Sequence, residues 1–587
     1  MSRKIAVDEQ SAKKLTGYPS IDRPWLQYYN EEAVSALVPE TTLLEYLYQH
    51  NKTSRDNIAL NYFGNKITYG ELFHYIDETA KAFVAQGVKP GDIVTLVTLS
   101  CVPSVLCLYG LNKIGAIVNY VNVLASQAEI ESYITDAGSK VVVTMDLFAE
   151  KVSNAAKNTA VHRMIEYSLA EYMPIVVKMG YVVKMRNYKA DHHGNDLFLS
   201  WRDFLTQGKE SGLDYSKKDA HTACYLAHTG GTTGVPKSVL LSDCSFNAVT
   251  QDYMLSMPHE RGEVFLSMMI PYVVYGTLIN IHMPLCLGLE TVLIPKFDPE
   301  KWPQYIKKYH PNHCCSIPAY IAPMAKNLKL KKMDLSRLFT VGVGGDGMNI
   351  PLEKSLNEFL AFTGSPARIQ KGYGMTEVCA TAVVEFKNAH KIGSVGIPLA
   401  KNVICVYDNE GQRECRYNET GEICMQCVSA MIGYKNNELE TKELFKTHPD
   451  GSVWIHTGDM GYMDEDGFLF LQGRIKRMIM TVIDGAVYKI VPAQVEEIIN
   501  GHEKVRESCV VGITHGKNKV LKAYVAAEED ADNILLEQEL RTLCSNGLSE
   551  NMRPVFYEFM RELPLTPAGK VDYQALEKEA EEVVAVG

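Results

Sequence analysis

A short stretch rich in glycine and threonine, residues 228–238, constrains this chain more than any other feature. It is His-Thr-Gly-Gly-Thr-Thr-Gly-Val-Pro-Lys-Ser and directly follows the apolar residues CYLA. Backbone N–H groups and hydroxyls in such a loop can surround phosphate oxygens, and the lysine adds a positive charge. The pattern predicts a phosphate-binding loop that follows a strand.

The loop differs from the Walker loop of P-loop NTPases at the residue before its lysine. The Walker pattern has glycine there, whereas Pro236 precedes Lys237 in this chain. Proline has no backbone N–H and little torsional freedom, so it cannot contribute to a Walker cradle. A P-loop NTPase is therefore disfavoured.

Length and pattern indicate a large α/β protein. A chain of 587 residues predicts about three to four domains. In the first third, strand-like and helix-like segments alternate, which is typical of parallel sheets covered by helices. Thr68 and Glu71, for example, have the spacing of a helix capping box and precede a predicted strand at 93–99. A net charge of −11 gives no reason to bind nucleic acid, which we exclude as a partner.

The pattern changes after about residue 475. A short helix closed by Gly501, two strands at 509–513 and 520–526, and a helix near 534–545 are expected there. This is a small α+β unit, and we expect it to move semi-independently.

Two stretches without Asp, Glu, Lys or Arg, Ile93–Asn112 and Phe265–Leu289, are long enough to suggest membrane spans. Each is interrupted by proline, at Pro103 in the first and Pro271 in the second, so we predict buried core and no transmembrane segment. Fourteen scattered cysteines and an N-terminus without an apolar run favour reduced thiols and a cytoplasmic location.

Residues 164–189 combine apolar side chains with Lys178, Lys184, Arg186 and Lys189. Two interpretations stay open for this part of a predicted insertion at about 160–200. It is either a helical element packed on the body of the protein, or a basic amphipathic element that contacts a membrane surface or an acyl chain.

The loop TGGTTGVPK resembles the phosphate-loop signature of the adenylate-forming superfamily, which includes acyl-CoA synthetases, peptide-synthetase adenylation domains and luciferases. Further motifs of that superfamily follow in order: Gly344-Gly345-Asp346, YGMTE (373–377), WIHTGD (454–459), GRIK (473–476) and PLTPAGK (564–570). The resemblance as a whole covers about residues 45 to 580. The resemblance implies a large N-terminal domain, residues 1–474, of parallel βα sheets plus a small barrel. It also implies a mobile α+β C-terminal domain, residues 477–587, with a hinge at Lys476.

The resemblance also implies roles for individual residues around ATP. Glu377 would help bind Mg²⁺, and Thr376 would contact the α-phosphate. Asp459 and Arg474 would hold the ribose. The adenine slot would be formed by Gly344, Gly345, Asp346, Tyr373 and Gly374, and the β- and γ-phosphates would be held by Thr229, Gly230, Gly231, Thr232, Thr233, Gly234 and Lys237.

Lys570 is implied to reach the α-phosphate and the carboxylate during adenylation and to leave when the small domain swings. Such a swing would let one chain perform two half-reactions. The chain has 17 residues after Lys570, with no room for a carrier domain, so we expect an external thiol acceptor. Coenzyme A is the first candidate. The alternatives are a free-standing ligase that loads an acyl carrier protein, favoured by an unusual stretch at Arg477–Val491, and a non-catalytic adenylate-binding sensor.

The expected acid is apolar. The segment Ile270–Gly276 lacks the aspartate with which amino-acid-activating relatives pair the substrate ammonium group. Gly374 stands where acetate-specific relatives have tryptophan, so we expect the missing side chain to open the acyl pocket. We predict a medium- to long-chain fatty acid first and an aromatic or alicyclic acid second, in a pocket formed with Met268, Met269, Tyr272, Val273 and Val274.

Overall fold

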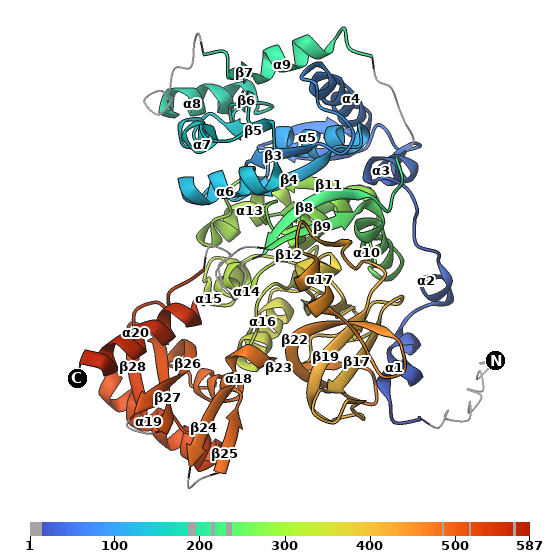
Figure 1. The fold of residues 1–587 in the computed structure, drawn as a ribbon. Helices are drawn as coiled ribbons and strands as arrows, with labels where there is room; N and C mark the ends of the chain where they lie inside the picture. The colour runs from blue at the N-terminus through green and yellow to red at the C-terminus, as the bar shows by residue number, and fades with distance from the viewer. Residues whose placement is uncertain are drawn as a thin grey trace, which may run out of the picture.

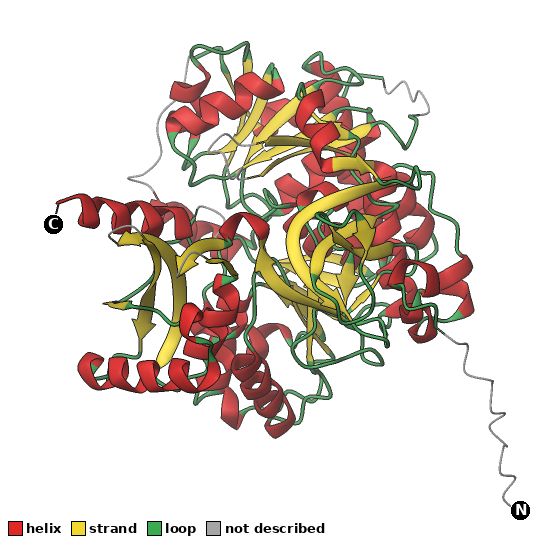
Figure 2. Ribbon diagram, turned by 60° about the horizontal axis from the view of Figure 1, so that its bottom comes forward, coloured by secondary structure: helices red, strands yellow, loops and turns green. Residues whose placement is uncertain are grey.

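The protein is described here by a computed structural model in which two large sheets, a smaller antiparallel sheet and a C-terminal unit are arranged around one another (Figure 1). The structure describes residues 15–185, 195–212, 218–229, 237–483, 486–515, 518–566 and 571–586. Helices lie on both faces of the large sheets, as Figure 2 shows, so the strands between them are almost wholly buried.

The first large sheet has eight strands in the order β20-β9-β8-β4-β3-β5-β6-β7. Its strands are β3 (Ile93–Val97), β4 (Ile117–Val121), β5 (Val141–Met145), β6 (Arg163–Tyr167), β7 (Phe198–Ser200), β8 (Ala223–Thr229), β9 (Lys237–Ser242) and β20 (Gly433–Tyr434). The strands from β8 to β7 pair in parallel, as the βα alternation predicts. The helices nearest in sequence are α4 (Tyr69–Ala85), α5 (Val102–Lys113), α6 (Gln127–Ala137), α7 (Ala149–Ala156), α8 (Ile175–Met185) and α9 (Trp201–Gly208).

The second large sheet has nine strands in the order β16-β15-β14-β13-β12-β10-β11-β1-β2. They are β1 (Ile58–Tyr62), β2 (Asn65–Thr68), β10 (Val264–Ser267), β11 (Glu290–Leu293), β12 (His313–Ser316), β13 (Thr340–Val343), β14 (Ile369–Tyr373), β15 (Val383–Val384) and β16 (Ile397–Pro398). The associated helices are α3 (Leu43–Asn51), α10 (Asp243–Ser256), α11 (Val274–Thr277), the π-helix η3 (Leu278–His282), α12 (Met283–Cys286), α13 (Trp302–Tyr309), α14 (Pro318–Ile321), α15 (Pro323–Lys326) and α16 (Ile350–Phe362).

The third sheet is antiparallel and corresponds to the expected small barrel. Its strands are β17 (Val403–Asp408), β18 (Arg413–Glu414), β19 (Gly421–Gln426), β21 (Phe445–Thr447), β22 (Val453–Met463) and β23 (Leu469–Arg474), and α17 (Glu438–Leu444) precedes β21. The N-terminal elements α1 (Pro19–Asp22) and η1 (Pro24–Tyr28) lie beside this sheet, whose core includes the fully buried Trp25. The short helix α2 (Glu31–Ser35) then leads towards the large sheets.

The C-terminal unit is the separate α+β domain that the sequence predicts. It contains β24 (Ile479–Ile483), β25 (Ala486–Ile490), α18 (Pro492–Asn500), β26 (Val505–His515), β27 (Asn518–Ala527), α19 (Asn533–Gly547), β28 (Phe556–Met560) and α20 (Tyr573–Val586). Its buried apolar residues form two clusters of their own, one on each side of the sheet β26-β27-β28. Among the described residues, the hydrophobic core of the third sheet extends as far along the chain as Phe470. The first hydrophobic core of the C-terminal domain begins at Ile479, so the two cores belong to different stretches of the chain.

Local predictions in the large domain are confirmed. Helix α4 begins after Thr68 with both capping-box hydrogen bonds to Glu71. The two apolar stretches are buried βα segments, and in the described part of the chain no helix is long and apolar enough to cross a membrane. All fourteen cysteines are free thiols.

The segment 164–189 differs from a single amphipathic element. Its first residues are strand β6, which pairs with β5 inside the first sheet, and its helical part is α8 alone. Residues 186–189 lie outside the described residues. The half-buried residues of β6, Arg163 and Glu166, are three residues apart as on one face of a helix, which explains why this strand could be mistaken for part of a helix.

Candidate active site

Antiparallel strands hold both ends of the predicted phosphate loop. Strands β8 and β9 pair Thr229 with Lys237 and His228 with Ser238, so seven residues connect two adjacent strand ends. Gly230, Gly231, Thr232, Thr233 and Gly234 belong to that connection and lie outside the described residues. The structure therefore fixes where the loop leaves and re-enters the sheet.

A contact through Tyr434 joins the loop lysine to Glu377. The Lys237 ammonium lies 4.9 Å from the centre of the Tyr434 ring and forms an ion pair with Glu440 of α17. The Tyr434 hydroxyl donates a 2.7 Å hydrogen bond to Glu377 Oε1. Burial, together with the Glu377 charge, raises the pKa of Tyr434, so its hydroxyl keeps the proton that it donates. Two predicted phosphate-site residues thus meet through a tyrosine that the sequence analysis did not select.

The predicted ribose residues lie together where the middle of β22 pairs with the last residue of β23. Asp459 and Arg474 are paired across β22 and β23, and Arg474 Nε lies 2.7 Å from Asp459 Oδ1. The buried Tyr373 hydroxyl donates a 2.6 Å hydrogen bond to the other oxygen, Oδ2. Burial and the adjacent Asp459 carboxylate raise the pKa of Tyr373 well above its ordinary value. The Asp459 carboxylate is therefore held from two sides.

The residues predicted for the adenine slot lie at the carboxyl ends of neighbouring parallel strands. β13 ends at Val343 and pairs with β14, which ends at Tyr373. A Cβ added to Gly344 would lie 3.3 Å from the Gly372 carbonyl oxygen, and Gly345 has φ of +83°. Asp346 is exposed, and its carboxylate accepts a hydrogen bond from the Gly347 N–H. The carboxyl edge of such a sheet is where ligands bind in open α/β proteins.

Thr376 and Glu377 begin the short helix η6 (Thr376–Val378), which directly follows β14. The Glu377 carbonyl accepts a 2.8 Å hydrogen bond from the Met431 N–H, which ties this turn to the segment that carries Tyr434. Lys476 is exposed in the helix η7 (Ile475–Arg477), between the third sheet and the C-terminal domain. Lys570 lies outside the described residues.

Comparison with known proteins now identifies the family. The AMP-binding enzyme profile matches residues 47–435, and the AMP-binding enzyme C-terminal domain matches residues 494–570. The chain belongs to the AMP-binding enzyme family. The predictions of an adenylate-forming enzyme and of its α/β architecture are confirmed.

Several relatives of this AMP-binding enzyme are similar over nearly their whole length. The long-chain-fatty-acid–CoA ligase of Bacillus subtilis (strain 168) is 28% identical, over 95% of this chain and 98% of the relative. The solved structure of the anthranilate CoA ligase AuaEII in complex with anthranoyl-AMP has a TM-score of 0.80 at 20% identity, over 94% of this chain and 99% of that one. ATP-bound MatB from Rhodopseudomonas palustris has a TM-score of 0.77 at 20% identity, over 92% and 100%.

The structure adds a polar cluster at the two strand ends that flank the phosphate loop of this AMP-binding enzyme. His228 Nε2 lies 2.7 Å from Asn119 Oδ1, and its Nδ1 lies 3.1 Å from the Ser238 hydroxyl. Ser238 in turn donates a 2.6 Å hydrogen bond to Asp136 Oδ2. Burial lowers the pKa of His228 to about 4, so the imidazole is neutral near pH 7. This cluster anchors the two ends of the loop to β4 and α6. The sequence analysis assigned no role to His228, because the residue stands at the start of the loop motif without a partner nearby in the sequence.

The predicted pocket residues divide into two groups. Met268 and Val274 are buried in separate hydrophobic cores, and Met269 lies against the Ser316 hydroxyl. Tyr272 and Val273 are only half-buried. The backbone of Gly276 packs directly against that of Ile270, because a Cβ at Gly276 would lie 2.0 Å from the Ile270 carbonyl oxygen. The half-buried pair is therefore the better placed to meet a substrate.

The expectation for Gly374 is corrected by the structure. A Cβ at this position would lie 2.1 Å from the Ala380 carbonyl oxygen and 2.9 Å from Thr381 Cα. The space that a side chain would occupy is filled by backbone, so the missing side chain does not open a pocket. Glycine is required here because the turn after η6, with positive φ at Cys379 and Ala380, folds back onto β14.

We predict that Asp459→Asn weakens ATP binding by about 10- to 150-fold, because hydrogen bonds to a charged group contribute about 1.5–3 kcal/mol. Isothermal titration with ATP in the absence of any acid would measure the dissociation constant. Asp466→Asn is the matched control, because Asp466 lies in the turn of the same hairpin and its carboxylate pairs with Lys391. Equal affinities for the two variants would contradict the role of Asp459.

Proposed function

We propose that this enzyme activates a carboxylic acid with ATP and transfers the acyl group to coenzyme A, releasing AMP and pyrophosphate. The observation that carries the proposal is the continuous contact path from Lys237 through Tyr434 to Glu377, together with the Asp459–Arg474 pair. These groups suit one nucleotide, with phosphates at one end and ribose at the other. The proposal is also supported by full-length similarity to relatives named long-chain-fatty-acid–CoA ligases.

The first half-reaction joins two anions. A carboxylate oxygen attacks the α-phosphorus of ATP, the bond to the bridging oxygen breaks, and pyrophosphate leaves with that electron pair. Lys237 would neutralise charge on the outer phosphates, and the Thr376 hydroxyl would donate to the α-phosphate. Holding both reactants in line removes most of the entropic cost of the encounter.

Glu377 fits the expected Mg²⁺. Magnesium is bound in proteins by one or two carboxylates together with phosphate oxygens and water. Glu377 is only 7% exposed, and Tyr434 donates to Oε1, which orients the carboxylate without neutralising its charge. Bound there with ATP, the ion would withdraw charge from the phosphates and make pyrophosphate a better leaving group.

The second half-reaction transfers the acyl group to a thiol. The sulfur of coenzyme A attacks the acyl carbon, the mixed anhydride bond breaks, and AMP leaves. We propose that Lys570 serves only the first half-reaction and that the C-terminal domain, residues 477–587, rotates about Lys476 between the two. The separate hydrophobic cores on either side of residue 476 support a boundary there.

We infer that the substrate acid is apolar, and our first candidate is a medium- to long-chain fatty acid. Tyr272 and Val273 present uncharged half-buried surface beside the nucleotide edge of the sheet, and no carboxylate in the segment 268–276 could pair with a substrate ammonium group. The relatives named long-chain-fatty-acid–CoA ligases point to the same class. An aromatic or alicyclic acid is the second candidate.

An acyl carrier protein is the alternative thiol acceptor. The observation behind it is the hairpin β24–β25, which contains most of the unusual stretch Arg477–Val491 and lies at the start of the C-terminal domain. This hairpin is where an acceptor surface would differ from that of ordinary relatives. A non-catalytic sensor is not favoured, because Glu377 and Lys570 are both present.

An assay across acids tests the proposed function. We predict acid-dependent ATP–pyrophosphate exchange that rises from acetate to fatty acids of medium and long chain, followed by thioester formation with coenzyme A. Benzoate-like acids and a loaded carrier protein are the comparison substrates. Absence of exchange with every carboxylic acid would contradict adenylation, and transfer only to the carrier protein would reject coenzyme A as the acceptor.

The proposed role of Lys570 gives a second prediction. Lys570→Ala should lower the adenylation rate by at least about 100-fold. The substitution removes a cation that would stabilise the negative charge developing in the transition state, and the loss of one such group has an effect of this size. Thioester formation from synthetic acyl-adenylate should change little. Lys578→Ala, on α20, is the control, and equal loss of both half-reactions in Lys570→Ala would argue against a domain swing.

We also propose that helix α8 binds a membrane surface from the cytoplasmic side. Ile175, Val176, Met179 and Val183 are 66–83% exposed, and Lys178 and Lys184 belong to the same helix. Apolar side chains with adjacent lysines are the pattern of helices that lie in the interface of anionic bilayers. A membrane contact would also supply an apolar acid directly. The free thiols of all fourteen cysteines agree with a reducing compartment.

We predict that the full chain sediments with vesicles that contain anionic lipid and that the double substitution Val176→Glu and Val183→Glu abolishes this binding. Two charges would be placed where apolar side chains enter the interface. Leu328→Glu is the control, because Leu328 is 72% exposed but lies outside α8. Unchanged sedimentation of the double variant would refute the membrane contact, whatever its activity.

A further inference from the structure

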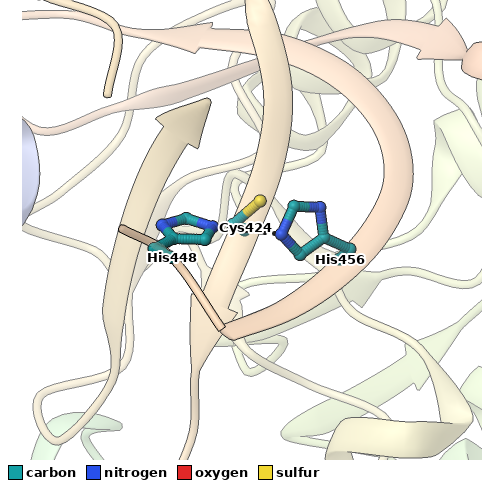
Figure 3. Close-up of side chains that lie close together, drawn as sticks. All are labelled: Cys424, His448 and His456. Atoms are coloured by element: carbon teal, nitrogen blue, oxygen red, sulfur yellow. Dashed lines mark hydrogen bonds between the residues drawn. The ribbon is translucent and has the colours of Figure 1, made fainter. Parts of the chain in front are cut away.

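A cluster of two histidines and a cysteine lies in the third sheet, away from the groups that face the nucleotide. Cys424 of β19 pairs directly with His456 of β22, and His448 lies in the turn between β21 and β22 (Figure 3). The Cys424 sulfur and one nitrogen of each histidine lie within 4.8 Å of one another. The two imidazoles are nearly perpendicular, with 3.0 Å between their Nε2 atoms.

His456 is oriented as a histidine ligand is. Its Nδ1 lies 2.8 Å from Glu422 Oε2, so the ring proton belongs on Nδ1 and the lone pair of Nε2 points into the cluster. Carboxylates that orient histidine ligands in this way are usual around protein metal ions. Glu422 is itself held by Asn409 at Oε2 and by the Gly458 N–H at Oε1.

His448 is also fixed in place. Its ring stacks on Tyr407, with 3.9 Å between ring centres, and on Trp454, with 5.6 Å between centres. The turn that carries it is closed by the Asp450 carboxylate, which accepts from both the N–H and the hydroxyl of Ser452. The side chain is therefore preorganised, and since His448 is only half-buried, one side of the cluster remains open to water.

We propose that Cys424, His448 and His456 bind a zinc ion, with water as the fourth ligand. Zinc–nitrogen bonds of about 2.0–2.1 Å and zinc–sulfur bonds of about 2.3 Å place tetrahedral ligand atoms about 3.3–3.7 Å apart, so the observed separations need only small side-chain shifts. On binding, His448 moves its proton from Nε2 to Nδ1, and the thiol of Cys424 releases one proton to solvent.

Charge favours a divalent ion at this site. The thiolate of Cys424 and the carboxylate of Glu422 together carry two negative charges, which Zn²⁺ neutralises in a buried environment. A monovalent ion such as Cu⁺ would leave one charge uncompensated. The mixed sulfur and imidazole donors also suit zinc better than Mg²⁺ or Ca²⁺, which prefer oxygen.

The ion would brace the strand that carries Asp459. Glu422 contacts both His456 and the Gly458 N–H, and Gly458 directly precedes Asp459. The Asp459 carboxylate has partners outside the cluster, Tyr373 and Arg474, so zinc binding can be tested separately from the proposed reaction.

Metal titration of the chelator-treated full chain tests the proposal. We expect one zinc per chain that is absent, or bound at least 10-fold more weakly, in both Cys424→Ser and His448→Gln. Cobalt in place of zinc should give a thiolate-to-cobalt charge-transfer band that Cys424→Ser removes. Zinc should also raise the melting temperature of the unsubstituted chain and leave that of the two variants unchanged.

Cys415→Ser is the matched control, because Cys415 is a buried thiol of the same hydrophobic core that lies outside the cluster. It should keep the zinc and the cobalt band. Melting temperatures measured without metal establish that each variant is folded. Zinc binding that is equal in all chains, or no binding by the unsubstituted chain, would overturn the proposal, and either result would leave the pyrophosphate-exchange test of the proposed reaction unaffected.

Discussion

The site depends on one short segment, residues 431–435, which joins strand β9 to helix η6 by backbone hydrogen bonds. Strand β20 pairs with β9 directly after the phosphate loop, and the flanking amides of Ile432 and Lys435 donate to Leu240 and Ser238. On the other side, the Met431 amide donates to the carbonyl of Glu377. Because backbone hydrogen bonds are short and directional, this segment sets the distance between the loop and η6.

Charge within the site follows from that arrangement. Tyr434 meets the Lys237 ammonium with its ring and the Glu377 carboxylate with its hydroxyl, so one side chain separates a cation from an anion. Lys237 is meanwhile paired with Glu440. Triphosphate oxygens offer more negative charge than one carboxylate, so ATP can compete for this lysine. The neutral His228, near the end of β8, avoids adding a second buried charge.

Several features of the fold could be predicted because they are local. The Thr68 capping box, the helix α18 before Gly501 and the strand pair β26–β27 each depend on residues within one element or one turn. Features that depend on distant packing were missed or misjudged. Gly374 suggested an open pocket, but the backbone of residues 380 and 381 fills that space, and this close approach leaves no signal in the YGMTE motif.

The order of the motifs by itself determined the family, since each motif is a short run of residues whose side chains suit one chemical task. The same motifs supplied the residues that we propose for ATP. Only the tertiary structure decided which of these groups touch. Tyr434, Glu440 and Ser238 join the site through strand pairing, and Cys424, His448 and His456 meet because β19 and β22 pair in one register. Their spacing along the chain fits no metal motif, and cross-strand neighbours are set by register, a relation that one strand's sequence does not contain.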